Sequence, residues 1–221
     1  MELDQKRKGG FDKYIMARYL GGRNRLARRE GVDLGLKTIG SSAHASLLRR
    51  IKILPGQHGQ KGVRKLSDYG KQLREKQKVK RIYGVLEKQF RRYFERASRE
   101  KGNTGEVLLS LLERRLDNVI YRLGIAPTRN ASRQFVAHGH ILVDDKKVNI
   151  PSFLVEKDMV ILPKKKILEI PAVKKLLEEK NLKIPSWLKR EGPVGKILRS
   201  PQRLDITDDI DEQLIIEYYS R

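Results

Sequence analysis

The sequence predicts an α+β fold, in which a mostly helical domain built from the N- and C-terminal segments carries an inserted small α/β domain. Three observations lead to this prediction. Apolar residues recur at spacings of three and four between residues 67 and 137, which is the period of an amphipathic helix. After residue 140 they fall in short runs separated by turn residues, as in short helices and a small, largely antiparallel sheet. Residues 214–219 are apolar enough to be buried, and we expect them to return to the first helical segment.

The first part of the chain, residues 16–66, is rich in Arg, Gly and Ser and has only short apolar runs. Arginine clusters such as Arg23-Asn24-Arg25 indicate an arm that orders on a partner or packs loosely around its few apolar residues. Residues 55–62 contain three Gly and one Pro, a composition that predicts a loop.

Helices are predicted next. One begins after Ser67-Asp68, because either side chain can cap a helix N-terminus. A single apolar stripe predicts that one long helix continues through Val79, Ile82, Tyr83, Leu86, Phe90, Tyr93 and Phe94. Glycines at 102 and 105 break this pattern, and Asn103 with Glu106 has the spacing of a capping box that starts a new helix. A further apolar stretch then runs to Gly124, which ends it as a C-cap.

The pattern changes in the second half. Thr128 caps a short helix that runs through Ala137. Residues 141–143 and 147–150, joined by a turn at Asp144-Asp145, are predicted to form a β-hairpin. Residues 153–155 and 159–162 give two further short strands, and residues 172–180 give a helix.

The charge of the chain indicates its partner. There are 49 Lys and Arg against 27 Asp and Glu, a net charge of +22. Surplus positive charge on a compact surface repels itself and is usually kept for a polyanion. Disordered arms are the alternative explanation, but 38% hydrophobic residues with clear periodicity favour a folded basic protein. We therefore expect a nucleic acid as partner.

Several classes of protein are disfavoured by the sequence. The chain has no cysteine, which excludes disulfides and thiolate metal sites and fits a reducing cytosol. No apolar stretch approaches the roughly 20 residues that cross a bilayer. The charged start of the chain leads into Gly9-Gly10 rather than an apolar core, so we expect no secretory signal, and no membrane as partner.

Catalytic and metal-binding patterns are weak. The four histidines are His44, His58, His138 and His140, and none is surrounded by enough carboxylates to make a metal site the favoured explanation. Asp208-Asp209 and Asp211-Glu212 could hold Mg²⁺ in a nuclease, but acidic residues also gather at a helix N-terminus, and a helix is predicted to follow. We expect no metal, no cofactor and no enzyme activity.

The basic residues form a more informative pattern. Thr128-Arg129-Asn130 opens a short helix whose N-terminal N–H groups could bind a phosphate. Arg133 lies on the same face as Arg129, and Lys146-Lys147 sit at the hairpin turn. Together they could hold one RNA backbone by shape and charge. The alternative is that these charges only keep the protein in solution.

Two stretches, residues 112–124 and 138–143, resemble the RNA-binding domain named after small-subunit ribosomal protein four. That domain also occurs in pseudouridine synthases and tyrosyl-tRNA synthetases. Stretches outside it, residues 54–59, 66–70, 73–78, 81–87 and 211–221, resemble the bacterial-type ribosomal family itself. The resemblance runs from about Met16 to Arg221.

The resemblance implies a non-catalytic protein of the ribosome in the cytoplasm. The sequence leaves open that the ribosome is that of an organelle. Such a protein binds small-subunit ribosomal RNA early in assembly, at a helix junction of the 5′ domain. It also lines the channel through which messenger RNA enters, contacts ribosomal protein five and contributes to translational accuracy. Some relatives repress their own message. The alternatives are an RNA-modifying enzyme or a stalled-ribosome binding factor that uses the same domain; neither small-molecule substrate nor cofactor is implied.

From the resemblance and the basic pattern we expect a set of RNA-binding residues, with the first seven toward the messenger channel. They are Arg49, Arg50, Lys52, His58, Lys61, Arg64, Lys65, Arg74, Lys78, Lys80, Arg81, Arg114, Arg115, Arg129, Arg133, His138, His140, Lys146 and Lys147.

The chain departs from the family pattern in three places. Many relatives carry four zinc-binding cysteines, and the matching positions here are Asn24, Ala27, Ser41 and Ser46, which implies the zinc-free form. Relatives are often more basic at Asn130, Ala131 and Ala137. Residues 1–15 precede a Met16 that resembles the usual start.

The resemblance also suggests how the chain is divided. The expected parts are an N-terminal extension, residues 1–15; a basic arm and loops, 16–66; a helical domain, 67–102 with 195–221; and the RNA-binding domain with the segment after it, 103–194.

Overall fold

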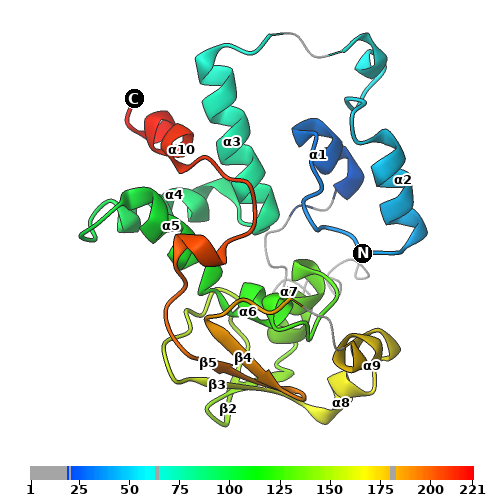
Figure 1. Ribbon diagram of the computed structural model, residues 1–221, viewed down its shortest axis with the longest axis vertical. Coiled ribbons are helices and arrows are strands. Elements are labelled where there is room, and N and C mark those ends of the chain that lie inside the picture. The colour runs from blue at the N-terminus through cyan, green and yellow to red at the C-terminus, as the bar shows by residue number, and fades with distance from the viewer. Residues whose placement is uncertain (1–18, 20, 63–64, 180–182) are drawn as a thin grey trace, which may run out of the picture.

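The computed structural model of the protein describes residues 19, 21–62, 65–179 and 183–221, so the expected extension at residues 1–15 lies outside the described residues (Figure 1). The described chain is α+β, with helices around a small antiparallel sheet, which confirms the predicted fold class. The helices are α1 (Arg23–Glu30), α2 (Ser42–Arg50), α3 (Asp68–Ile82), α4 (Glu87–Ala97), α5 (Thr104–Glu113), α6 (Leu116–Arg122), α7 (Arg129–Ala137), α8 (Lys165–Leu168), α9 (Pro171–Glu178) and α10 (Glu212–Tyr219). The strands are β1 (Ile141–Val143), β2 (Lys146–Val148), β3 (Val160–Pro163), β4 (Leu188–Glu191) and β5 (Val194–Ile197).

The basic arm is folded in the described part of the chain. Ala27 of α1 and Leu47 of α2 are buried, and the side-chain amide of Asn24 donates to the carbonyl of Ala43 at 2.9 Å. The guanidinium of Arg28 donates to the carbonyls of Ile53 and Leu54 at 2.9 and 3.0 Å. Residues 55–62 are mostly turns, with one short 3-10 helix at Gly59–Lys61. Arginine, amide and apolar contacts therefore hold the arm.

The four positions that match zinc cysteines have other roles here. Asn24 and Ala27 make the arm contacts just described, and the Ser41 hydroxyl caps α2 by accepting from the backbone N–H of His44 at 3.2 Å. Ser46 is exposed. None of these side chains is a thiolate or imidazole, so the set does not fit zinc. Across residues 19, 21–62, 65–179 and 183–221, no group of three or more His, Asp or Glu could hold a metal ion.

The predicted long helix is wrong, because the chain forms α3 and α4 instead. Ser67 caps α3 as expected, accepting from the N–H of Gly70 at 3.2 Å. Gly84, however, has φ +63° and turns the chain through a left-handed conformation that ends the helix. Much of the apolar stripe is buried, since Val79, Ile82, Tyr83 and Phe90 are 4% exposed or less, whereas Leu86 is 36% exposed. It covers two helices.

A second break separates α5 from α6. Asn103 begins α5 as predicted, but its side chain accepts from the N–H of Gly105 at 2.9 Å. Arg115 then adopts an extended conformation and forms an isolated β-bridge with Leu154. That bridge is all that the structure shows of the strand predicted at 153–155, so that strand is wrong.

The hairpin and α7 follow the prediction. Asp144 and Asp145 have φ of 46° and 62°, the left-handed pair that a tight two-residue hairpin turn requires. Leu142 pairs with Lys147 on one side and with Leu162 of β3 on the other. Thr128 caps α7, with its hydroxyl accepting from the N–H of Ala131 at 3.2 Å.

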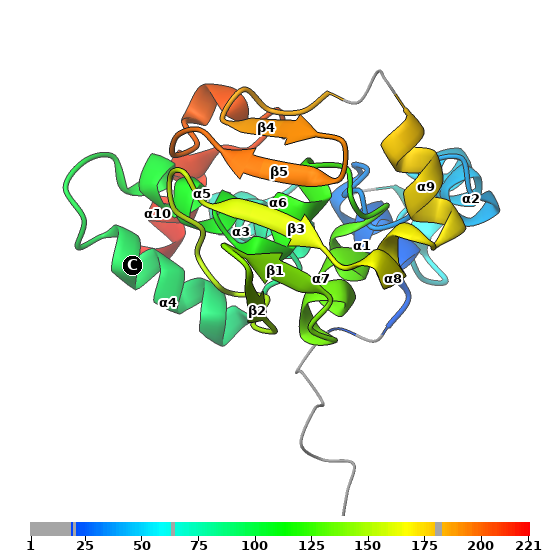
Figure 2. The ribbon, with the colours of Figure 1, turned by 90° about the horizontal axis from the view of Figure 1, so that it is seen from below.

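The sheet is completed by strands that the sequence did not predict. Its order is β2-β1-β3-β5-β4, and every pairing is antiparallel (Figure 2). The helix predicted at residues 172–180 is α9, and residue 180 lies outside the described residues. α6 lies behind the sheet, close enough that a Cβ on Gly195 of β5 would meet Leu123 at 2.3 Å. Only a glycine fits there.

Two clusters of buried apolar side chains form the core. The first combines α3, α4, α5, the arm and Ile206, Ile210 and Ile215 of the C-terminal segment. The second combines α6, α7 and the sheet. α10 packs on α3 and α5, and the ring of Tyr219 stacks on Phe94 with centroids 4.6 Å apart. The predicted return of the C-terminus to the helical part is confirmed.

The buried leucines of α5 lie in the first cluster. We therefore propose that the boundary between the helical and inserted domains falls near residue 113 rather than at 103, and that residues 195–197 stay with the sheet.

Glu87 at the start of α4 ties the C-terminus to α3. Its carboxylate accepts from Lys76 at 2.6 Å, Lys80 at 2.8 Å and Tyr219 at 2.9 Å. Burial by itself would raise the pKa of Glu87, but these three hydrogen bonds outweigh it and lower the pKa to about 2. Because the folded-state pKa is depressed, Glu87 stabilises the fold above the unfolded-state pKa and loses this effect as pH falls toward 2.

We expect Glu87→Gln to lower the free energy of unfolding at pH 7. The difference from the parent protein should stay constant down to about pH 5 and shrink below it. Urea unfolding monitored by circular dichroism at pH 7, 5, 4 and 3 measures this. Glu100→Gln, which removes only an exposed pair with Arg96, is the control and should show almost no difference at any pH. A pH-independent deficit for Glu87→Gln would contradict the proposed linkage.

Candidate nucleic-acid interface

Many of the cations that face solvent gather in three places. The first, here called the arm patch, lies on α1, α2 and the loop after them; its exposed members are Arg25, Arg29, Arg49, Arg50, Lys52, Lys61 and Lys65. The second, the hairpin patch, surrounds the end of α7; its members are His138, His140, Lys146, Lys147, Lys164, Lys165 and Lys166. The third is the outer face of α4 and the turn after it, with Lys88, Arg91, Arg92, Arg96, Arg99 and Lys101.

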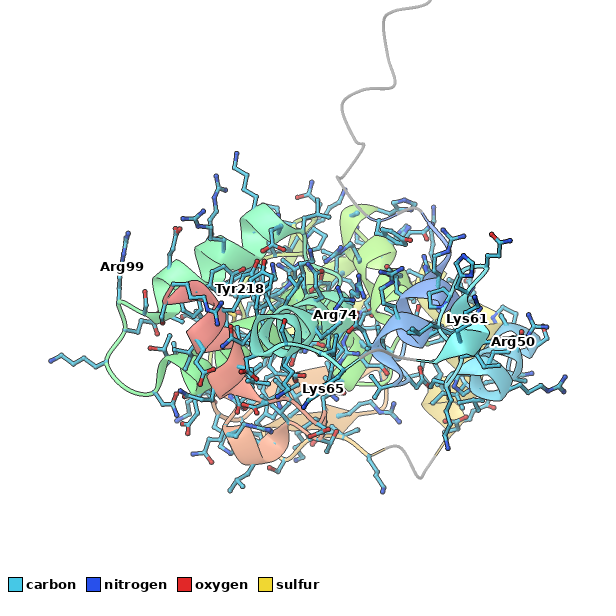
Figure 3. The ribbon with its side chains drawn as sticks, turned by 90° about the horizontal axis from the view of Figure 1, so that it is seen from above. Arg50, Lys61, Lys65, Arg74, Arg99 and Tyr218 are labelled. Carbon is cyan, nitrogen blue, oxygen red and sulfur yellow. The ribbon has the colours of Figure 1, made fainter. Side chains whose placement is uncertain are left out.

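The three places span the molecule. Arg50 and Lys61 of the arm patch project at one end, and Arg99 projects at the opposite end (Figure 3). Among the described residues, no arm-patch cation has a carboxylate partner within 4 Å, whereas Arg91 and Arg96 on α4 pair with Glu95 and Glu100. The arm patch is therefore the larger source of uncompensated charge, and charge of this kind attracts a polyanion.

The hairpin patch is built by a close turn. Gly139 has φ +67°, and the aliphatic part of Lys147 lies where a side chain at 139 would be, 2.2 Å from an added Cβ. The rings of His138 and His140 meet edge to face with centroids 6.0 Å apart. Burial lowers the pKa of His140, and the positive charges of His138, Lys164, Lys166 and Lys147 lower it further. This cluster of cations suits a phosphate group.

A buried set of charges lies between the two core clusters. Here called the junction network, it consists of Glu113, Asp117, Asp208, Arg115, Arg122, Arg129 and Arg133. These residues come from α5, α6, α7, the turn between α5 and α6, and the segment before α10. Four guanidinium groups thus meet three carboxylates inside the protein.

Glu113 is the hub on the helical side. It is 1% exposed and accepts hydrogen bonds from Tyr83 at 2.7 Å, Asn118 at 2.8 Å and Arg122 at 2.7 Å. Arg122 also donates to Asp208 at 2.7 Å, which links the C-terminal segment. Burial alone would lower the pKa of Arg122, but the two carboxylates raise it above its ordinary value. Burial, and then the charge of Glu113, raise the pKa of Tyr83.

Asp117 is the hub on the side of the sheet. It is 3% exposed and accepts from Arg115 and Arg133, each at 2.8 Å. Arg133 also donates to the carbonyl of Gly84 at 2.8 Å, and Arg115 donates to Tyr93 at 2.9 Å. Through these bonds α6 and α7 are joined to the turn between α3 and α4.

Arg129 is inside the protein. Its Nε donates to Asn118 at 2.8 Å, and its guanidinium lies over the ring of Tyr121 at 4.5 Å. Thr128 and Arg129 are each 7% exposed, so the N-terminus of α7 is not open to a phosphate from outside. The expectation that Arg129 and Arg133 grip an RNA backbone from a free helix end does not fit this geometry. We propose that Arg129, Arg133 and Arg115 hold in place the elements that carry the RNA-binding surface.

The other expected RNA-binding residues divide by exposure. Arg49, Arg50, Lys52, His58, Lys61, Lys65, His138, Lys146 and Lys147 are exposed, and Arg64 lies outside the described residues. Partly buried are Arg74, Lys78, Lys80, Arg81, Arg114 and His140. The side chains of Arg74 and Arg81 bind Glu30, Lys78 binds Glu75, Lys80 binds Glu87, and Arg114 donates to the carbonyl of Val155.

Three cations of the hairpin patch, Lys164, Lys165 and Lys166, were not predicted. Lys164 and Lys166 lie near His140, and the backbone N–H of Lys164 donates to the carbonyl of His140 at 2.9 Å. The sequence pattern that could have indicated them is the run of three lysines at residues 164–166, shortly after the strand predicted at 159–162.

No helix among the described residues is long and apolar enough to cross a membrane.

The chain is similar to known proteins over almost its whole length. Residues 18–113 match the family described as "Ribosomal protein S4/S9 N-terminal domain", and residues 114–161 match the "S4 domain". Small ribosomal subunit protein uS4 of Pelotomaculum thermopropionicum is 51% identical over 209 residues, and that of Aeromonas hydrophila is 52% identical over 209 residues. The one from Neisseria meningitidis is 50% identical over 211 residues. Each match covers 93% of this chain and 100% of the relative.

We expect Asp117→Asn to destabilise the protein by about 3–5 kcal/mol, since it leaves two guanidinium groups buried without their carboxylate. Chemical unfolding measured by fluorescence or circular dichroism gives the free energy. The matched control is Glu95→Gln, which removes an exposed i,i+4 pair with Arg91 and should cost no more than about 0.5 kcal/mol. Equal losses for the two variants would show that the junction network adds no more than a surface pair.

Proposed function

Because this chain belongs to the family of small ribosomal subunit protein uS4, we propose that it organises a helix junction of small-subunit ribosomal RNA during assembly. It is a structural protein of the small ribosomal subunit that binds RNA, and it is not an enzyme. The observation that carries the finer proposal is the junction network, which links α7, next to the hairpin patch, to α6, to the turn between α3 and α4 and to the segment before α10.

Charge supplies the affinity. Each Lys or Arg that meets a phosphate releases a counterion, so the binding free energy comes largely from surfaces such as the arm patch and falls as salt rises. Such contacts fix register and orientation, and folded RNA is recognised mainly by its shape. A junction of several RNA helices offers phosphates on different sides, which suits a protein whose cations span both of its ends (Figure 3).

Geometry supplies the selectivity. Two basic surfaces that moved independently would bind many RNA shapes, and each would lose conformational freedom on binding. Here Asp117 binds Arg133 of α7, which donates to the carbonyl of Gly84 at the end of α3, and Arg74 and Arg81 of α3 bind Glu30 of α1 in the arm. We propose that this fixed spacing selects one RNA junction.

The place of the protein in the particle is also proposed. Arg50 and Lys61 lie at one end of the molecule (Figure 3), and we place the arm patch and the loop from His58 to Lys65 toward the channel for messenger RNA. The same resemblance assigns ribosomal protein five as a neighbour and a contribution to translational accuracy. The protein then works in the ribosome, in the cytoplasm of a bacterial cell.

The sequence leaves two other functions open, an RNA-modifying enzyme and a stalled-ribosome binding factor. The chain covers the full length of relatives that are named as ribosomal proteins, which supports the ribosomal role over both. Salt-resistant cosedimentation with small subunits from growing cells would separate a permanent component from a transient factor.

We expect the triple change Arg49→Ala, Arg50→Ala and Lys52→Ala to weaken binding to small-subunit ribosomal RNA. The slope of log affinity against log salt concentration should also become less negative by roughly 2 to 3. This is about 0.7–0.9 for each phosphate that is no longer neutralised. Filter binding at low and high KCl concentrations measures both. The control is Lys174→Ala with Lys175→Ala on α9, outside the three basic places. An unchanged slope for the triple variant would remove the arm patch from the interface.

We expect RNA affinity to rise as pH falls from about 8 to 5.5, because a bound phosphate favours the protonated form of His140. In the free protein the pKa of His140 is lowered, so the proton is taken up on binding, and affinity rises by at most about one log unit per pH unit. His140→Gln should abolish this dependence and match the parent protein at about pH 8. A parent protein with pH-independent binding would contradict the phosphate site.

A further inference from the structure

A pocket is lined by residues of α1, α3 and α7 and by the turn at Gly84. Its volume is about 170 Å³, and its apolar walls are Leu26, Leu36, Val85 and Leu86. Leu36 and Val85 are each 4% exposed and belong to the core, whereas Leu86 is 36% exposed and forms the lip. The pocket therefore has fixed apolar sides and an opening to solvent.

The polar lining of this pocket is unusual. Two amides, Gln77 of α3 and Asn130 of α7, line it, and the structure shows no hydrogen bond between either side chain and another described residue. Each amide keeps a donor and an acceptor for a ligand. A ligand that is only apolar would leave these groups unpaired, which is unfavourable in a partly buried site.

The charged lining has one sign. The cations Arg23, Lys80, Arg81 and Arg133 contribute to it, and no carboxylate is among the described residues that line it. Lys80, Arg81 and Arg133 are held in place by carboxylates outside the pocket, and Arg23 has no carboxylate partner within 4 Å in the described chain. Arg23 is therefore the lining cation whose charge is left for an anionic group at the opening.

We propose that this pocket takes one unpaired nucleotide of the bound ribosomal RNA. The flat faces of a base suit the leucine and valine walls, its hydrogen-bonding edge suits the two amides, and its phosphate suits Arg23 at the opening. The volume is below the roughly 300–1,000 Å³ of pockets for larger ligands, which fits a single base and excludes a stacked pair.

The position of the pocket supports the same ligand. It lies between the segments that match the two family domains, residues 18–113 and 114–161, so an RNA strand seated there contacts both. The exposed arginines 25 and 29 of the arm patch are on α1, which also forms one side of the pocket. This inference rests on the proposed function and adds a base-recognition site to it.

The double variant Gln77→Leu with Asn130→Leu tests the proposal. It removes both amides at nearly constant volume and removes no charge. We expect RNA affinity to fall by about 5-fold to 150-fold, the range for removing a bidentate amide–base pair. The slope of log affinity against log salt should not change, because every phosphate keeps its cation. Thermal unfolding should also be unchanged, since neither amide bonds to another described residue.

The control and a structural readout separate this site from a general effect. Gln134→Leu with Asn149→Leu changes the same two residue types at exposed positions that do not line the pocket, and should bind like the parent protein. Dimethyl sulfate and a carbodiimide together probe the Watson–Crick edges of unpaired bases. We expect the parent protein and the control to protect one unpaired nucleotide that reacts freely in the complex with the pocket variant.

Three results would overturn the proposal. They are affinity indistinguishable from that of the parent protein, an identical protection pattern, or ultraviolet crosslinks in the parent complex that all lie away from peptides lining the pocket. The crosslinking needs no variant, so it decides the matter even if the double variant does not fold. Failure of the proposed function looks different, because the parent protein itself would then not bind small-subunit ribosomal RNA.

Discussion

Two buried carboxylates, Glu113 and Asp117, are the groups on which the arrangement of this protein depends. Each is 3% exposed or less and holds arginines that would otherwise be uncompensated inside the protein. An ion pair in such a place is not a strong source of stability by itself, because desolvation offsets much of the attraction. What it does provide is geometry, since a guanidinium and a carboxylate bind in few orientations. Apolar contacts between the two core clusters are not directional and do not fix one relative position. The ion pairs of the junction network do, because they allow few orientations.

The network also keeps one more cation than it has carboxylates. Arg129 is the extra one: its nearest carboxylate, Asp208, is 3.6 Å away, and one of its terminal nitrogens has no hydrogen bond. The rings of Tyr121 and Tyr83 lie 4.5 and 5.4 Å from the guanidinium carbon and offset this charge by cation–π attraction. A basic protein that binds RNA thus uses some of its arginines to hold its own parts together. Three of these arginines, Arg115, Arg129 and Arg133, are residues that the sequence alone assigns to RNA.

Features that depend on a few consecutive residues could be predicted from the sequence, whereas features that depend on tertiary contacts could not. The caps at Ser67 and Thr128 and the turn at Asp144-Asp145 were predictable, because each depends on a few consecutive residues. The break at Gly84 was not, since the apolar period continues across it and only the third dimension shows that two helices share one stripe. β4 escapes prediction because residues 189–191 are all charged, which hides the alternation of an edge strand. The roles of Arg115, Arg129 and Arg133 depend on partners that the fold brings together.

The fold also explains why the arm needs no metal. A zinc site would fix α1 against α2 by four bonds to one ion. Here Arg28 fastens the end of α1 to the carbonyls of residues 53 and 54, Asn24 fastens its start to residue 43, and Ala27 and Leu47 fill the space between. These contacts come from several side chains in parallel, so no single one has to be as strong as a metal ligand. Because Arg28 donates to backbone carbonyls rather than to carboxylates, this contact adds no negative charge to the arm. Its remaining arginines stay available for a polyanion, which is the condition that binding RNA at this end of the molecule requires.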